Sequence, residues 1–382
     1  RSDTHPIFGL HRLPYIWAGL LPMVLSLPLL PVITALLAGD PASPLGWGLA
    51  AFAFLIYGIG TLISGSTYLA LVRDSAPPAK RGMALSIVQI FLVVSFPVAG
   101  IVYGRLMPDY DQAAFWRMTL FGMVGSALLF FVSLFGEERR GQSIAVGESA
   151  PPPAQVPFLT LLRDMWADRR ARLFFLFLAL GAMSAFAQDA VLEPFGGQVF
   201  NMSVGETTRF NAYWGSGVVL SLLGTVFFTR NRQAHEQTGT TVVGLLLTGL
   251  PLALLGGVSL ATAESLLVPV LFLFGIGFGI YTVGAVSLLM AMTADDRAGA
   301  YLGLWTVAQL LFRGVGVFLG GMVRDLVYAL SGSFSVAYAS VFFLEAVGLA
   351  ACALLVVKVD VPGFARSAGA AVPAATLAAT AE

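Results

Sequence analysis

Long apolar segments separated by short polar stretches make up most of this sequence of 382 residues. A helix needs about 20 apolar residues to cross the hydrocarbon core of a bilayer, and each segment is close to that length. The composition, 57% hydrophobic and only 11% charged, is not that of a soluble globular domain. The pattern predicts an all-α membrane protein with ten transmembrane helices, at 14–37, 47–71, 82–104, 118–136, 173–195, 210–229, 241–261, 265–292, 299–323 and 334–357.

Basic residues are distributed unevenly between the two sides of the predicted membrane. If successive connections alternate sides, one side holds most of the 21 Lys and Arg residues. The other side holds only Arg105, Arg117, Arg209 and Arg324. Because positively charged connections stay in the cytoplasm, we predict that both ends of this chain are cytoplasmic. The formal net charge is zero, so nothing indicates a nucleic-acid partner.

The longest polar stretch, 137–172, divides the chain into two halves and contains three consecutive prolines. Its end, 158–166, carries apolar residues on one helical face and is predicted to be an amphipathic helix on the cytoplasmic membrane surface. An ordinary polar loop is the alternative. The predicted organisation is an N-terminal half-bundle at 1–136, a linker at 137–172, a C-terminal six-helix half-bundle at 173–358 and a disordered tail at 359–382.

An internal repeat relates the two halves. The first four spans match the last four in the same orientation, as in transporters built from parallel repeats. The fifth and sixth spans have no counterpart, so a symmetric parent would have twelve helices, of which this chain holds the third to the twelfth. The matched positions are Tyr57–Gly60 with Phe274–Gly277, Arg81 with Arg297, Gly100 with Gly316, and Gly104 with Gly320.

Two acidic residues mark one end of the fifth span. Asp189 and Glu193 are four residues apart, so on a continuous helix they would share one face. Pro194 and the pair Gly196–Gly197 are expected to break the helix just past them. A carboxylate at membrane depth costs about 2.5–3.5 kcal/mol on insertion scales, and desolvation is expected to keep one of the two acids protonated. The alternative is a wet position at the membrane interface.

A second charged set lies deeper. Arg313 and Glu345 fall near the middle of consecutive spans, where an ion pair would offset most of the penalty of burying either alone. Such a pair would either join the two helices or form a polar spot in a central cavity. Gln309, Gln89 and Gln188 could add amide groups to such a cavity. Glycine-rich faces in the same spans favour close helix packing, with a groove for a flat macrocycle as the alternative.

Catalytic patterns are absent from the sequence. We find no phosphate-binding loop, no dinucleotide fingerprint and no metal-ligand spacing, and the one cysteine and three histidines do not cluster. A prenyl transferase would hold diphosphate through Mg²⁺ with acidic clusters. Asp189 and Glu193 have that spacing, but no second cluster accompanies them. We therefore expect no enzymatic activity.

Six plus six spans with a long cytoplasmic linker resemble the major facilitator superfamily, and three motifs narrow the resemblance. The opening RSDTH…GLHRLPYIW, with Asp3 and Arg12, is similar to the loop between the second and third spans. RDSAPPAKRG at 73–82, with Asp74 and Arg81, is similar to the loop after the fourth span; Arg297 repeats Arg81. The third motif, AQDAVLEPFGGQVFNMSVGETT at 187–208, resembles the signature of the PucC/LhaA family, also called the bacteriochlorophyll delivery family.

That resemblance implies an assembly factor for light-harvesting complexes in the photosynthetic inner membrane. It would supply bacteriochlorophyll to antenna polypeptides and could contact the reaction centre–antenna complex. Because no histidine lies within a span, the pigment Mg²⁺ would be bound by water, a backbone carbonyl, an amide such as Gln89, or His11 at the cytoplasmic edge. A proton-coupled solute transporter using Asp189 or Glu193 is the alternative function.

Overall fold

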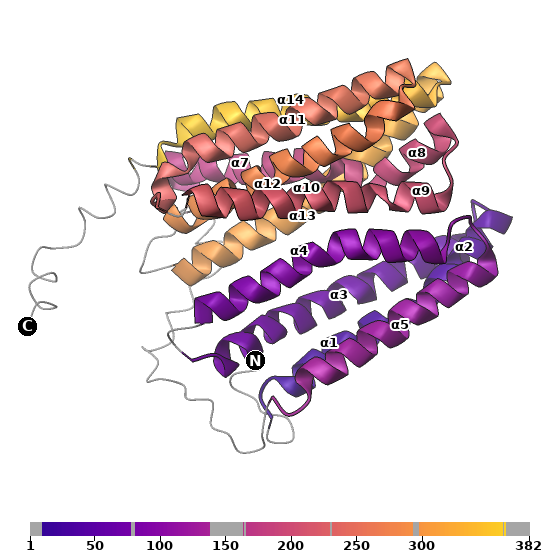
Figure 1. Ribbon diagram of the computed structural model, residues 1–382, viewed down its shortest axis with the longest axis horizontal. Coiled ribbons are helices and arrows are strands. Elements are labelled where there is room, and N and C mark those ends of the chain that lie inside the picture. Colours follow the sequence, from indigo (N-terminus) through magenta and orange to yellow (C-terminus); the bar gives the residue numbers. More distant parts are fainter. Residues whose placement is uncertain are drawn as a thin grey trace, which may run out of the picture. The chain divides into compact units, whose positions relative to one another are not determined.

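The computed structural model describes residues 10–77, 81–137, 163, 166–229, 231–292, 298–361 and 363. Asp3, Arg297 and most of the predicted amphipathic helix lie outside this part of the chain. The regular elements of the described residues are helices (Figure 1). They are α1 (Leu13–Ser26), α2 (Leu29–Gly39), α3 (Pro44–Ser75), α4 (Arg81–Leu106), α5 (Gln112–Leu134), α7 (Arg169–Phe186), α8 (Leu192–Phe200), α9 (Val204–Thr208), α10 (Phe210–Thr229), α11 (Thr238–Ala261), α12 (Leu267–Ala291), α13 (Ala298–Ser331) and α14 (Phe334–Val359).

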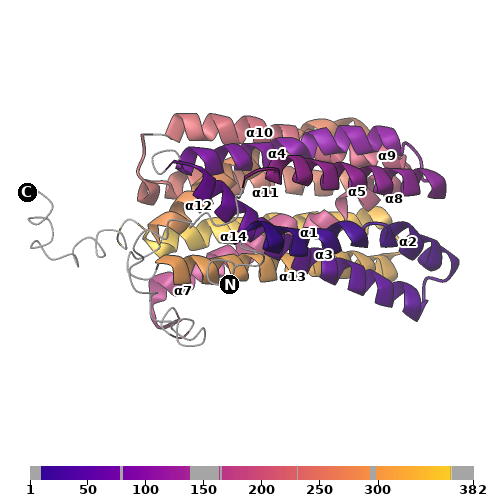
Figure 2. The same cartoon turned by 90° about the horizontal axis from the view of Figure 1, so that it is seen from below.

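The chain divides into two compact units. The first contains Arg1–Leu92 and Val102–Ser149, and the second contains Val93–Ile101 and Ala150–Glu382. In the first unit, α1 and α2 follow one another along α3 (Figure 2). In the second unit, α11 packs against both α12 and α14, and α7 packs against α13 and α14.

Eight helices among the described residues are long and apolar enough to cross a membrane. The predicted count of ten is therefore too high by this measure. The predicted spans at 82–104 and 299–323 correspond to α4 and α13, which are not among the eight. In α4 the apolar part is the shorter stretch Phe91–Leu106, and α13 carries the charged residues Arg313, Arg324 and Asp325. The all-α membrane architecture is confirmed.

The first span is interrupted near its middle. Helix α1 ends at Ser26 and α2 begins at Leu29, while the two together form one span of 27 residues. Pro28 has no N–H and cannot continue the hydrogen-bond ladder of α1. Ser26 donates its hydroxyl to the Met23 carbonyl at 2.7 Å, which gives the last turn of α1 a local partner. The break therefore leaves irregular backbone within the bundle, where packed protein can tolerate it.

Close helix packing explains the glycine-rich faces. At Gly60 an added Cβ would meet the Gly19 carbonyl oxygen on α1, and at Gly277 it would meet the Leu247 carbonyl oxygen on α11. These two glycines are partners in the internal repeat, and both mark tight helix crossings. The same close approach of neighbouring backbone is found at Gly100, Gly275, Gly279, Gly316 and Gly320.

Large aromatic side chains fill the core of the second unit. Phe195 of α8 contacts Tyr338 and Phe342 of α14 at ring-centroid distances of 5.4 and 5.1 Å. All three side chains are fully buried, with 0% exposure. Within a bilayer, van der Waals packing of this kind is what holds helices together. This aromatic cluster anchors the short helix α8 to α14.

A matched pair of substitutions tests the packing role of Gly60. An added methyl group at Gly60 would meet the backbone of α1, whereas Gly58, two residues earlier on α3, has open space around it. We expect Gly60→Ala to lower the free energy of unfolding by about 1–3 kcal/mol, as overpacking does. Gly58→Ala should be neutral or stabilising by up to about 1 kcal/mol. Thermal unfolding of both variants in detergent provides the measurement, and equal midpoints would contradict the packing explanation.

Candidate functional site

The helix break in the 187–208 motif lies earlier than expected. Helix α7 ends at Phe186, and a 3-10 turn at Ala187–Ala190 follows it. Helix α8 then contains Pro194 and both glycines that were expected to break the chain. Pro194 is tolerated because it lies in the first turn, where its missing N–H would have no intrahelical partner. The helix ends instead at Asn201, which adopts the left-handed conformation with φ of 57°.

This geometry separates the two acidic residues. A 3-10 turn has three residues per turn instead of 3.6, so the i, i+4 rule does not carry across it. Asp189 lies in the turn and Glu193 lies in the first turn of α8. Their side chains bond to different helices, α13 for Asp189 and α10 for Glu193. The expected shared helical face was wrong.

Asp189 forms the ion pair that was expected of Glu345. The Arg313 guanidinium donates to the Asp189 carboxylate at 2.9 Å. The same guanidinium lies over the Phe186 ring, 4.1 Å from its centroid, which is the geometry of a cation–π contact. The predicted Arg313–Glu345 pair is therefore wrong. Arg313 instead joins α13 to the break after α7.

Glu345 is almost fully buried, with 2% exposure. Its Oε1 accepts a hydrogen bond from the backbone N–H of Gln188 in the 3-10 turn. The Gln188 side-chain amide in turn donates to Asp189 at 3.1 Å. A continuous polar network thus joins α14, the 3-10 turn and α13. We call Gln188, Asp189, Arg313 and Glu345 the polar corner.

Three further hydrogen bonds of the motif were not predicted from the sequence. The Asn211 amide of α10 donates to Glu193 at 2.7 Å. Burial raises the pKa of the Glu193 carboxyl above its usual value of 4.5, and the Asn211 hydrogen bond opposes that shift. Gln198 of α8 accepts from the Tyr338 hydroxyl at 2.6 Å and from Arg324 at 3.4 Å. A polar residue in the first turn of an apolar helix, as Asn211 is, was the available signal.

The remaining part of the motif forms a helix start. Ser203 and Glu206 make a capping box, in which the Ser203 side chain accepts from the Glu206 N–H and the Glu206 carboxylate accepts from the Ser203 N–H. This arrangement satisfies two donors that the first turn of a helix leaves free. Figure 1 shows α8 and α9 as short helices at one end of the long helices of the second unit. The motif therefore builds a defined turn between α7 and α10.

Other predicted site residues lie elsewhere. Gln309 is partly buried on α13, one turn before Arg313. His11 and Arg12 precede α1, and Arg12 is 7% exposed. The side chains of Gln89, Asp74 and Arg81 lie outside the described part of the structure. No group of three or more metal-binding side chains occurs among the described residues.

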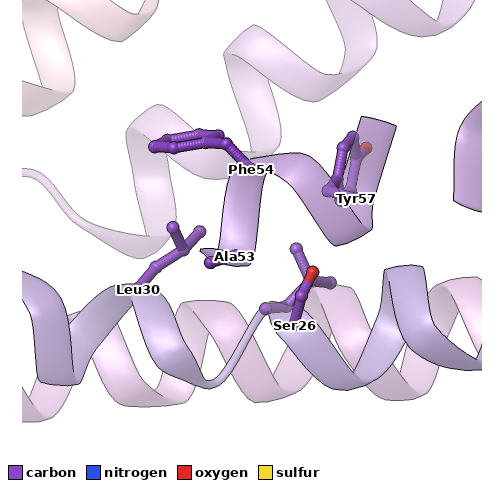
Figure 3. A pocket seen from close by; sticks show the side chains of 6 residues that line it. Ser26, Leu30, Ala53, Phe54 and Tyr57 are labelled. Atoms are coloured by element: carbon purple, nitrogen blue, oxygen red, sulfur yellow. The ribbon is translucent and has the colours of Figure 1, made fainter. Parts of the chain in front are cut away.

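A small cavity in the first unit has none of the predicted site residues in its lining. It is lined by Ser26, Leu27 and Leu30 at the Pro28 break, and by Ala53, Phe54 and Tyr57 of α3 (Figure 3). Its volume is about 240 Å³, below the roughly 300–1,000 Å³ of sites for drug-sized ligands. A second cavity in this unit, beside Tyr68 and Glu137, holds about 260 Å³. Neither is large enough for a tetrapyrrole macrocycle.

Known proteins resemble this chain in both sequence and fold. It is 31% identical over 293 residues to the bacteriochlorophyll synthase 44.5 kDa chain of Rhodobacter capsulatus, covering 74% of this chain and 66% of that relative. It is 28% identical over 358 residues to the protein PucC of the same organism, covering 91% and 77% of the two chains.

The fold is that of major facilitator transporters. A crystal structure of a bacterial homologue of the iron transporter ferroportin superposes with a TM-score of 0.67 at 14% identity, covering 94% of this chain and 84% of that one. At that identity the likeness concerns the fold alone. A family model described as PUCC protein matches residues 1–364, and the chain therefore belongs to the PUCC family.

Proposed function

We propose that this protein is an assembly factor for bacterial light-harvesting complexes. It binds and delivers bacteriochlorophyll and docks antenna polypeptides within the photosynthetic inner membrane, with both ends of this chain in the cytoplasm. The observation that carries the proposal is the PUCC family match over residues 1–364, combined with a relative whose name refers to bacteriochlorophyll. The apolar helices supply the membrane surface on which antenna helices could pack.

A non-catalytic role is supported by the arrangement of the acidic residues. Binding diphosphate through Mg²⁺ requires carboxylates that converge on one ion. Asp189 is engaged with Arg313, and Glu193 with Asn211, so the two acids are committed to different helices. We therefore propose that the motif shapes the protein and does not hold a diphosphate.

The transporter alternative rests on fold likeness, which carries no information about a substrate at 14% identity. Pigment binding rests on the family relationship. Bacteriochlorophyll would supply the absorbing macrocycle and a Mg²⁺ ion that His11 or Gln89 could ligate. The cavities of about 240 and 260 Å³ do not fit that macrocycle. We therefore place the pigment in neither cavity, and His11 and Gln89 stay predicted ligands.

Pigment content separates the two functions. Purification of this protein from a phototrophic host in mild detergent should yield bacteriochlorophyll absorbance or antenna subunits in a fixed ratio to the protein. The control is the same preparation from a host that makes no bacteriochlorophyll. Colourless protein free of antenna subunits, together with proton-driven solute uptake by reconstituted vesicles, would favour the transporter.

Substitutions at Glu193 test the role of the motif in assembly. Glu193→Gln keeps a carbonyl oxygen that can accept from Asn211, so most antenna assembly should remain. Glu193→Ala leaves the part-buried Asn211 amide without this acceptor, which typically costs about 1–3 kcal/mol, so antenna absorbance should fall. The assay is antenna absorbance in membranes of a complemented deletion strain, normalised to the amount of this protein. Glu264→Ala, an exposed acid in the same unit, is the control. Wild-type behaviour of Glu193→Ala would exclude a role for this contact.

The raised pKa of Glu193 also predicts a pH dependence of stability. Below the ordinary value of 4.5, the group is protonated in both the folded and the unfolded protein. As pH rises above that value, the unfolded state releases the proton first, so the contribution of Glu193 to stability declines until the folded state also ionises. As pH rises, the unfolding midpoint of the wild type should therefore fall relative to that of Glu193→Gln. A difference that is constant with pH would contradict the burial of this carboxyl group.

A further inference from the structure

Two buried oxygen atoms of the polar corner have no hydrogen-bond donor among the described residues. They are Oε2 of Glu345 and Oε1 of Gln188. The two residues are 2% and 3% exposed, and they are already joined by the hydrogen bond from the Gln188 N–H to Glu345 Oε1. A buried polar atom without a partner costs about 1–3 kcal/mol. Two such atoms on residues in contact therefore need a common explanation.

Both atoms are acceptors, so the missing group is a hydrogen. The Gln188 amide nitrogen donates to Asp189, and the Arg313 guanidinium pairs with Asp189, so these bonds are made to other oxygens. A proton on Glu345 Oε2 would turn one acceptor into a donor. That donor could then satisfy the Gln188 amide oxygen, and both unpartnered atoms would be accounted for without any additional molecule.

The charges around Glu345 favour the same conclusion. The nearby Asp189 carboxylate would repel a negative charge on Glu345, and Arg313 is committed to Asp189. Helix α11, which packs on α14, has no charged residue. Further charged residues on the elements packed against α14 are those on α7 (Arg169, Arg170, Arg172), on α8 (Glu193) and on α13 (Arg324, Asp325). The three arginines of α7 occupy its first turn, and Arg324 pairs with its neighbour Asp325. Glu193 is itself an acid, so its charge would not offset a negative charge on Glu345.

We propose that Glu345 and Gln188 form a proton-binding site inside the second unit. Glu345 is a neutral carboxylic acid that donates from Oε2 to the Gln188 amide oxygen, while its Oε1 accepts from the Gln188 N–H. Two hydrogen bonds then hold α14 to the 3-10 turn after α7. Loss of the proton would place two carboxylates beside that turn and remove one of the two bonds. The inference is independent of the proposed role in pigment delivery.

Infrared spectroscopy of the purified protein tests the site directly. A protonated carboxyl group has a C=O stretch distinct from that of a carboxylate and from amide bands. We expect such a band at mildly alkaline pH, and we expect Glu345→Gln to remove it. Glu193→Gln, the same chemical change on α8, is the control and should leave the band in place. Absence of the band in wild type, or its persistence in Glu345→Gln, would overturn the proposal.

Stability gives an independent readout that does not depend on the spectrum. Glu345→Gln supplies both an oxygen to accept from the Gln188 N–H and an N–H to donate to its amide oxygen. It should therefore unfold at a temperature close to that of wild type, whereas Glu345→Ala should unfold at a clearly lower one. A Gln variant as unstable as the Ala variant would mean that Glu345 acts as an ion, and the neutral-acid assignment would be wrong.

Discussion

The hydrogen bond from the Gln188 N–H to Glu345 is the interaction on which the polar corner depends. Within a membrane, backbone groups released by a helix break find no water, so they must be satisfied by protein. The 3-10 turn at Ala187–Ala190 creates that problem, and a carboxyl group from α14 solves it. Asp189, Gln188 and Arg313 then arrange around the same turn. The polar side chains gather here because the backbone is irregular here.

Glycine packing determines which helices can reach the turn. Backbone atoms of Met183 and Ala187 lie where Gly316 and Gly320 would carry side chains. This approach brings α13 against the end of α7 and places Arg313 within reach of Asp189. Larger residues would hold the helices apart, and the 2.9 Å ion pair could not form. Helix association in membranes relies on such contacts because lipid offers no hydrophobic driving force between helices.

The polar residues of the family motif at 187–208 each make a specific contact within the second unit. Gln188 bonds to α14 and Asp189 to α13. Glu193 bonds to α10, and Gln198 bonds to both α14 and α13. Ser203 and Glu206 start the next helix. The motif joins α10, α13 and α14 at one end of this unit. Any pigment or antenna contact nearby would meet a surface whose shape these bonds maintain.

The sequence by itself determined the membrane class, the position of most helices, the family and the identity of the few charged residues within spans. These features depend on local composition and on glycine, proline and motif patterns, which do not require knowledge of neighbouring helices. The partners of Asp189, Arg313 and Glu345 were decided only by the tertiary structure. A change from 3.6 to three residues per turn rotates every later side chain, so the i, i+4 rule failed between Asp189 and Glu193. Depth along two consecutive spans likewise says nothing about facing direction, and Arg313 turned toward α7 because the glycines of α13 pack there.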